Sequence, residues 1–232
     1  MYKGLAIKPP LFEFGPKAYL YGEKMLKLAK VADQVARKYD VRVIVTPQYT
    51  DIGMLAQETE NLLIFAQHMD PITTGRGIGS VLPEAIKAAG AVGVMLNHAE
   101  QPMGVSELYK AIKRADEVGL ASIVCADSIA EAAAIAHFVP NIIVAEQSDL
   151  IGTGQTSDEE YIVKTSAAVK TINPEILVLQ GAGISSGADV YRIIKAGAEA
   201  TGSSSGITKA KDPAAMIEEM IKAVRVAWDE FH

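Results

Sequence analysis

A single glutamate stands where a buried strand is expected to end and a glycine-rich loop to begin. Residues 141–145 form an apolar run, Glu146 follows it directly, and Gly152 and Gly154 flank Thr153. A carboxylate held at a strand end can act as a general base. Glycines let a loop change its backbone conformation and let amides approach an anion closely. The segment predicts a catalytic base beside a mobile loop, although a surface loop with a solvated glutamate would share this pattern.

Three other parts of the chain place polar residues directly after an apolar run. His98 and Glu100 follow the run at residues 92–96. The segments 180–187 and 203–206 are rich in glycine and serine. Turns of this composition can bind a phosphate through backbone amides, aided by a helix N-terminus. A Gly-Ala-Gly turn alone is a weak motif, so ordinary tight turns are the alternative for these segments.

A repeating pattern of elements could bring these side chains together. Short apolar runs alternate with stretches whose apolar residues recur three or four positions apart, as in amphipathic helices. Ser106, Ser128 and the segment 157–160 are helix-start signals, and Gly90, Gly119 and Gly197 mark helix ends. The predicted strands cover residues 4–8, 41–46, 62–67, 92–96, 120–126, 141–145, 176–180 and 199–203.

Eight strand-then-helix units predict an α/β fold, a closed (β/α)8 barrel. A doubly wound open sheet is the structural alternative, since each unit alone would fit it. The barrel is favoured by the count of eight and by the two phosphate-type turns after the last two strands. Chemistry in such barrels lies at the carboxyl ends of the strands. Those ends carry Lys8, His98, Glu146, Gly181 and Ser204.

Composition bounds the class of protein. The 232 residues, 49% of them hydrophobic, suffice for one domain with a large core, and we expect a single domain over residues 1–232. The 28 acidic against 22 basic residues argue against nucleic acid or an anionic membrane as partner. Cys125, the one cysteine, excludes a disulfide framework and a cysteine-rich metal site. Without a membrane span or signal peptide, the expected compartment is the cytoplasm.

These segments, in their order along the chain, resemble the triosephosphate isomerase family. Residues 146–154 are similar to the catalytic glutamate and mobile loop of the family, and residues 94–100 to its fourth-strand segment. Residues 180–187 and 203–210 are similar to its two phosphate loops, the latter in the archaeal style. The resemblance covers almost the whole chain. It implies a TIM barrel and an isomerase that interconverts a small phosphorylated aldose and ketose, with triose phosphate favoured, through an enediolate.

The resemblance also implies roles for individual residues. Glu146 is the expected base, and His98 the hydrogen-bond donor to the substrate carbonyl. We expect no cofactor and no metal. Family members pack the loop at residues 73–79 against a neighbouring barrel, so a homo-oligomer, dimer or tetramer, is expected. The residues expected to bind the substrate and its phosphate, besides Lys8, are Gly152, Gly154, Gly181, Gly183, Ser185, Ser204, Ser205 and Gly206.

The chain departs from the family at the end of the first strand. Family members carry Asn-x-Lys there, with the lysine offsetting substrate charge. Aligned on residues 6–7, Lys8 takes the asparagine position and Pro10 the lysine position. We predict that Lys8 supplies the catalytic and substrate-binding charge, paired with Glu100. The same departure would also fit a pocket rebuilt for another substrate, a loss of catalysis, or a purely structural Lys8. A second departure is Ile78, where family members have a threonine.

Three other functions are compatible with these residues. An isomerase of another ketose phosphate, a tetrose or larger, would use the same base and donor. A Schiff-base aldolase would use Lys8 as its amine. A catalytically silent homologue would bind sugar phosphates without exchanging protons with solvent.

Overall fold

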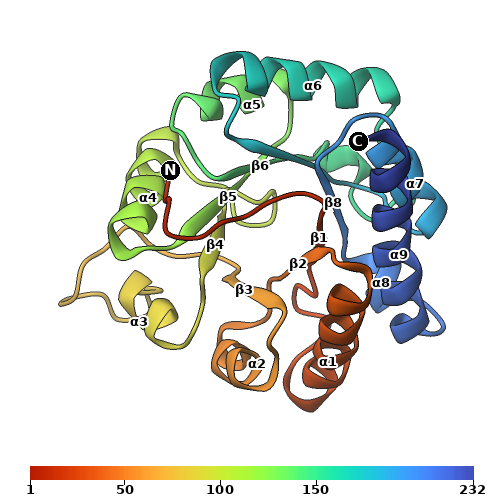
Figure 1. Cartoon of the computed structure of the whole chain (residues 1–232). Helices are drawn as coiled ribbons and strands as arrows, with labels where there is room; N and C mark the ends of the chain where they lie inside the picture. Colours follow the sequence, from red (N-terminus) through yellow and green to blue (C-terminus); the bar gives the residue numbers. More distant parts are fainter.

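The computed structural model describes residues 1–232, and its eight parallel strands form a closed barrel (Figure 1). Each strand pairs with the next in sequence, and the eighth pairs with the first, which confirms the predicted barrel. The strands are β1 (Leu11–Phe14), β2 (Arg42–Val45), β3 (Leu62–Ala66), β4 (Gly93–Leu96), β5 (Ala121–Ala126), β6 (Ile142–Ala145), β7 (Leu177–Gln180) and β8 (Ala200–Ser203).

Helices surround the barrel and follow its strands. They are α1 (Gly22–Tyr39), α2 (Ile52–Glu58), α3 (Pro83–Ala88), α4 (Val105–Val118), α5 (Ile129–Ala136), α6 (Glu159–Ile172), α7 (Gly187–Lys195), α8 (Ser205–Thr208) and α9 (Pro213–Phe231). Two short 3-10 segments, η1 (Tyr49–Asp51) and η2 (Ser148–Leu150), lie in loops. Ser128 caps α5 as predicted by accepting from the Glu131 amide. In the signal at residues 157–160 the cap of α6 is Asp158, which accepts from the Tyr161 amide. Ser106 is not a cap, because Gly104 precedes α4.

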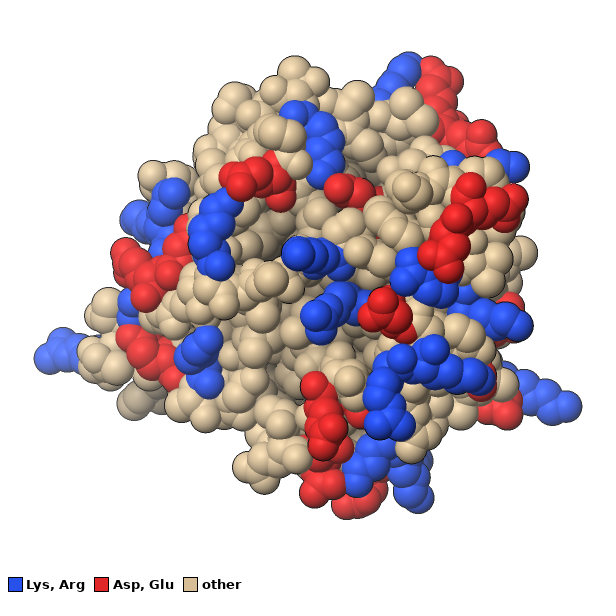
Figure 2. All heavy atoms as spheres, in the orientation of Figure 1, with Lys and Arg blue, Asp and Glu red and all other residues tan.

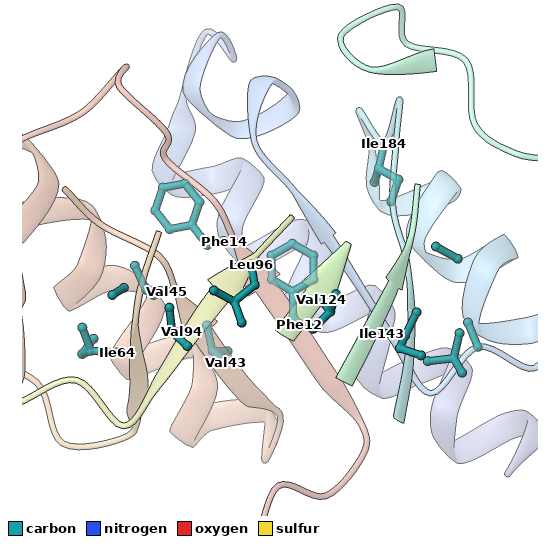
Figure 3. Packing of buried hydrophobic residues seen from close by; sticks show 14 of the residues in the cluster. Phe12, Phe14, Val43, Val45, Ile64, Val94, Leu96, Val124, Ile143 and Ile184 are labelled. Atoms are coloured by element: carbon teal, nitrogen blue, oxygen red, sulfur yellow. The ribbon is translucent and has the colours of Figure 1, made fainter. Parts of the chain in front are cut away.

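The core has two layers, because successive strand residues point to opposite faces of the sheet. One cluster fills the barrel interior and includes Leu11, Ile44 and Phe65. The larger cluster lies between strands and helices, and Figure 3 shows part of it, with Phe12 and Phe14 of β1. On β1 this alternation places Glu13 on the interior face. A carboxylate therefore lies in an otherwise apolar barrel.

The first strand was predicted at residues 4–8, and this position is wrong. The strand is β1, and residues 4–8 precede it. The apolar side chains of Leu5 and Ile7, which suggested a strand, pack against the interior cluster from its amino-terminal end. The true strand is short and has a charged residue at its centre, so its sequence does not stand out as an apolar run.

Residues 1–8 cross the amino-terminal end of the barrel (Figure 1). The Asn141 side chain donates to the Tyr2 carbonyl at 2.8 Å, and Lys3 forms an ion pair with Glu175 at 2.8 Å. A cavity of about 240 Å³ lies beneath this segment, and Lys8 is one of its lining residues. The segment is therefore tied to the end of the barrel opposite the expected site.

Charged side chains of both signs are interspersed over the face shown in Figure 2, without a continuous basic surface. No helix of the structure has the length and apolar character that a membrane crossing would demand.

Candidate active site

A cavity of about 640 Å³ opens at the carboxyl ends of the strands. This size suits a small-molecule site. Its walls come from the loops after seven of the eight strands, all except β5, and these loops are far apart in sequence. Its lining includes Glu13, Gly15, Lys17, Thr46, His98, Glu100, Glu146, Gly152, Gly181, Gly183, Gly202, Ser204 and Ser205.

Glu146 stands directly after β6, as predicted, and its carboxylate faces His98. Its Oε1 accepts from the Ala182 amide at 3.2 Å, and its Oε2 lies 3.6 Å from His98 Nε2. Burial raises the pKa of this carboxyl, while the positive charge of Lys17 and the Ala182 amide oppose that rise. A partly desolvated carboxylate with a raised pKa is a stronger base than a solvated one.

His98 is held with one ring nitrogen turned away from the cavity. Its Nδ1 accepts a hydrogen bond from the Glu100 amide at 3.0 Å. An accepting Nδ1 carries no proton, so the neutral ring has its proton on Nε2, the atom nearest Glu146. Burial lowers the pKa of His98, the charge of Lys17 lowers it further, and Glu100 opposes both. The ring is therefore a neutral hydrogen-bond donor at neutral pH.

Asn97 anchors the turn that carries His98. This residue has a left-handed backbone, with φ of 58°. Its side-chain amide donates to the Cys125 carbonyl at 3.0 Å and to Glu131 at 3.1 Å, and its oxygen accepts from the Met103 amide. These bonds tie the loop after β4 to β5 and α5. The donor position of His98 is thereby fixed by the scaffold.

Lys17, which sequence reasoning missed, is the lysine that lines the cavity. Its φ of 50° is in the left-handed region, which costs a non-glycine residue about 1–3 kcal/mol. Its carbonyl accepts from Gln48 Nε2 at 2.8 Å and from Gln67 Nε2 at 3.0 Å, which hold this conformation. Its Nζ lies 2.7 Å from Glu100 Oε1 and lowers the pKa of that carboxyl. A strained backbone held by two amides indicates a functional position.

The two late loops lie side by side and were predicted to bind phosphate. Ser203 Oγ, at the end of β8, donates to the Ile184 carbonyl at 2.8 Å and joins the loops. Ser204 Oγ is buried without a hydrogen-bond partner. Gly181, Gly183, Ser204 and Ser205 line the cavity, whereas Ser185 and Gly206 do not. The Ser185 hydroxyl instead donates to Asp189 at 3.1 Å, which places it behind the loop.

The loop after Glu146 closes one side of the cavity. Gly152 and Gly154 have positive φ of 74° and 76°, but only Gly152 lines the cavity. The backbone of Gln155 lies against Gly183, so closely that a Cβ on Gly183 would be 1.8 Å from the Gln155 carbonyl oxygen. The loop is therefore in contact with one of the phosphate-type turns.

Sequence comparisons agree with this geometry. The family model described as triosephosphate isomerase matches residues 17–222. The chain belongs to the triosephosphate isomerase family. A triosephosphate isomerase of Methanothermus fervidus is 41% identical over 203 residues, covering 86% of this chain and 91% of that protein. One of Methanobacterium bryantii is 40% identical over 220 residues, covering 93% and 97%. One of Sulfurisphaera tokodaii is 36% identical over 219 residues, covering 93% and 95%.

The prediction that Lys8 stands in for the lysine of triosephosphate isomerases is wrong. Lys8 precedes β1 and lies at the amino-terminal end of the barrel, outside the site cavity. Glu100 pairs with Lys17 instead. The error came from aligning the family motif on residues 6–7. With β1 at Leu11–Phe14, the family Asn-x-Lys falls on Gly15-Pro16-Lys17.

One departure from the triosephosphate isomerase motif therefore remains at this corner. The lysine is present, but glycine replaces the asparagine at position 15. Two residues earlier, Glu13 lines the same cavity from inside the barrel. Sequence reasoning missed both features, although an acidic residue at the centre of an apolar tetrapeptide was a visible sign.

Proposed function

We propose that this member of the triosephosphate isomerase family interconverts dihydroxyacetone phosphate and glyceraldehyde 3-phosphate through an enediolate. The observation that carries the proposal is the approach of Glu146 Oε2 to His98 Nε2, at 3.6 Å, beside the charge of Lys17. A base, a neutral donor and a cation around one small cavity are what the reaction requires. The relatives with up to 41% identity are named for this activity.

The proton transfer is assigned to Glu146. Its carboxylate removes a proton from the substrate carbon beside the carbonyl. The electron pair of that C–H bond forms the carbon–carbon double bond of the enediolate, and the carbonyl oxygen takes up negative charge. Glu146 then returns the proton to the adjacent carbon. The resemblance implies this role, and the raised pKa of the carboxyl supports it.

His98 and Lys17 stabilise the developing charge. The Nε2 proton of His98 hydrogen-bonds the two substrate oxygens, between which the hydroxyl proton moves. The neutral ring is suited to this, because its donor strength is close to that of an enediol. Lys17 adds a fixed positive charge near the oxyanion, where a water-poor pocket makes it worth several kcal/mol.

Backbone amides are assigned to the substrate phosphate. Gly183, Ser204 and Ser205 supply them from two joined loops, and the Ser204 hydroxyl has no other partner. Gly181 lies beside Glu146 and lets the two loops approach. Gly152 of the loop after β6 closes over the same cavity and excludes water from the enediolate.

A coupled assay with triose, tetrose and pentose phosphates tests the proposal. We expect the highest kcat/KM for glyceraldehyde 3-phosphate and tight binding of 2-phosphoglycolate, which resembles the enediolate in charge. Preference for a tetrose or larger ketose phosphate would overturn the triose assignment. Weak phosphoglycolate binding without turnover would indicate a silent homologue. An aldolase through Lys8 is set aside, since Lys8 is outside this cavity.

We further propose a homo-oligomer acting in the cytoplasm in carbohydrate metabolism, on the glycolytic reaction of its relatives. The loop at residues 73–79 supports the oligomer, because it is exposed throughout and Ile78 at its tip is fully exposed. The glycines of this loop do not restrict its backbone conformation, so contact with a partner subunit would be needed to fix it. The mixed surface charges support a small sugar phosphate, rather than nucleic acid or a membrane, as the partner.

A further inference from the structure

Glu13 is a buried carboxyl in the cavity that the proposed reaction does not use. It lies at the centre of β1 on the interior face and is 9% exposed. Thr46 Oγ1, just after β2, donates to its Oε1 at 2.9 Å. The cavity residues nearest the interior cluster are apolar, among them Met95, Val144 and Leu179. Glu13 is therefore a carboxyl on the otherwise apolar floor of the site, where the burial of a polar group is costly.

Two glycines make room for this carboxyl. A Cβ on Gly15 would lie 2.9 Å from Glu13 Oε1, and a Cβ on Gly202 would lie 3.0 Å from Oε2. The atoms that meet the Gly15 Cβ are all from the Glu13 carboxyl group. The carboxyl thus occupies the volume in which a side chain at position 15 would begin. Position 15 is the one where the family motif has asparagine.

We propose that Glu13 contacts the reacting end of the substrate, donating a hydrogen bond from the cavity floor in place of a side chain at position 15. The proposal rests on the proposed isomerase function and adds a further catalytic residue to it. The acceptor of the hydrogen bond from Glu13 is an oxygen of the substrate's hydroxy-carbonyl group, which becomes the enediolate.

The charge state of Glu13 is suited to donation. Its pKa is raised to about 8, chiefly by burial and also by the nearby Glu146, while the Thr46 hydrogen bond and the charge of Lys17 oppose the rise. Cys125 on β5 also faces it and is itself a neutral buried thiol. At neutral pH the group is mainly a carboxylic acid. Because Thr46 donates to Oε1, the acid proton belongs on Oε2, from which it can be donated.

Ionisation of Glu13 would work against the reaction. A carboxylate has no proton to donate and would place negative charge beside the enediolate. Wild-type kcat/KM should therefore fall as the pH rises through about 8, the pKa of Glu13. Glutamine at position 13 keeps the shape, accepts from Thr46 and donates from its amide without ionising. The Glu13→Gln variant therefore distinguishes the effect of the hydrogen bond from the effect of Glu13 ionisation.

The test compares Glu13→Ala and Glu13→Gln with wild type on glyceraldehyde 3-phosphate across pH 6–10. We expect Glu13→Ala to lower kcat/KM at pH 7 by about tenfold or more, the loss of one hydrogen bond. Glu13→Gln should recover part of that loss and remove the decline near pH 8. Circular dichroism verifies folding. Full activity in folded Glu13→Ala, or the same decline in Glu13→Gln, would overturn the proposal. If Glu13→Ala does not fold, the Glu13→Gln pH profile decides.

A double-mutant cycle tests the shared volume. Gly15→Asn alone must displace the Glu13 carboxyl and should lower kcat/KM. In Glu13→Ala/Gly15→Asn the asparagine has room, and its amide can reach the vacated volume. We expect the double variant to be more active than either single variant. Additive losses would overturn the claim that the two side chains share one position.

Failure of the proposed function would look different. An inactive wild-type enzyme with normal folding would reject the isomerase assignment, whatever the variants do. An active wild type with unaffected Glu13 variants would reject only the role of Glu13.

Discussion

At the scale of single residues, the proposed reaction depends most closely on where the Glu146 carboxylate lies. It stands between the Ala182 amide and the His98 ring. Its two oxygens have different neighbours, at 3.2 Å and 3.6 Å. Glu146→Asp withdraws the carboxylate by one methylene. We expect kcat to fall about 100-fold, the cost of a misplacement near 1 Å. Steady-state kinetics on glyceraldehyde 3-phosphate measure this, and Glu146→Ala with near-normal activity would refute the base assignment.

Glu13 has a consequence for stability that is independent of catalysis. Its pKa is raised from 4.5 to about 8 in the folded state, so the folded protein holds the proton more tightly. Its stabilising contribution is complete below pH 4.5 and is lost as the pH rises toward 8.

Relative to Glu13→Gln, the unfolding free energy of wild type should therefore fall between pH 4.5 and 8, by at most about 1.4 kcal/mol per pH unit. Urea unfolding of both proteins at pH 5, 7 and 9 checks this. The contributions of titratable groups that both proteins share cancel in the difference between their unfolding free energies. A difference that is constant with pH would mean that Glu13 ionises normally.

At the scale of elements, the strands with continuous apolar runs could be predicted and the first strand could not. Glu146 and His98 follow such runs, and they were placed at strand ends from the sequence. β1 carries Glu13 at its centre, and the apolar residues before it cover the barrel end instead of joining the sheet. Lys8 was misplaced for this reason. The left-handed backbone of Lys17 could not be predicted from the sequence either, because Gln48 and Gln67 hold it from the loops after β2 and β3.

The joined loops after β7 and β8 allow a test of phosphate binding. Ser205 begins α8 and lines the cavity. A carboxylate there should repel the phosphate, so Ser205→Asp should raise KM for glyceraldehyde 3-phosphate by tenfold or more, about 1.4 kcal/mol of binding. Ser205→Asn is the control, because asparagine has the size of aspartate without its charge, and it should raise KM less. Equal KM in Ser205→Asp and wild type would exclude the loop from the site.

At the scale of the whole molecule, the loop at residues 73–79 extends from the barrel into solvent. Residues 73–79 are exposed, and Ile78 at the tip is an apolar side chain fully in water. Burial of such a side chain against a second barrel would gain about 1.5–3 kcal/mol. We expect wild type to sediment as a dimer or tetramer at micromolar concentration, and Ile78→Asp to shift it toward monomer. A monomeric wild type would contradict this.

The cation of the site is Lys17, whereas the sequence suggested Lys8. Lys17 and Lys8 are nine positions apart and lie at opposite ends of the barrel, so Lys8→Met is a matched control for Lys17→Met. Both changes keep an unbranched side chain and remove one charge. The most direct measurement is kcat/KM for glyceraldehyde 3-phosphate in both variants. We expect a loss of orders of magnitude in Lys17→Met, because the charge near the enediolate is worth several kcal/mol, and a near-normal value in Lys8→Met. Wild-type kinetics in Lys17→Met, or an equal loss in Lys8→Met, would contradict it.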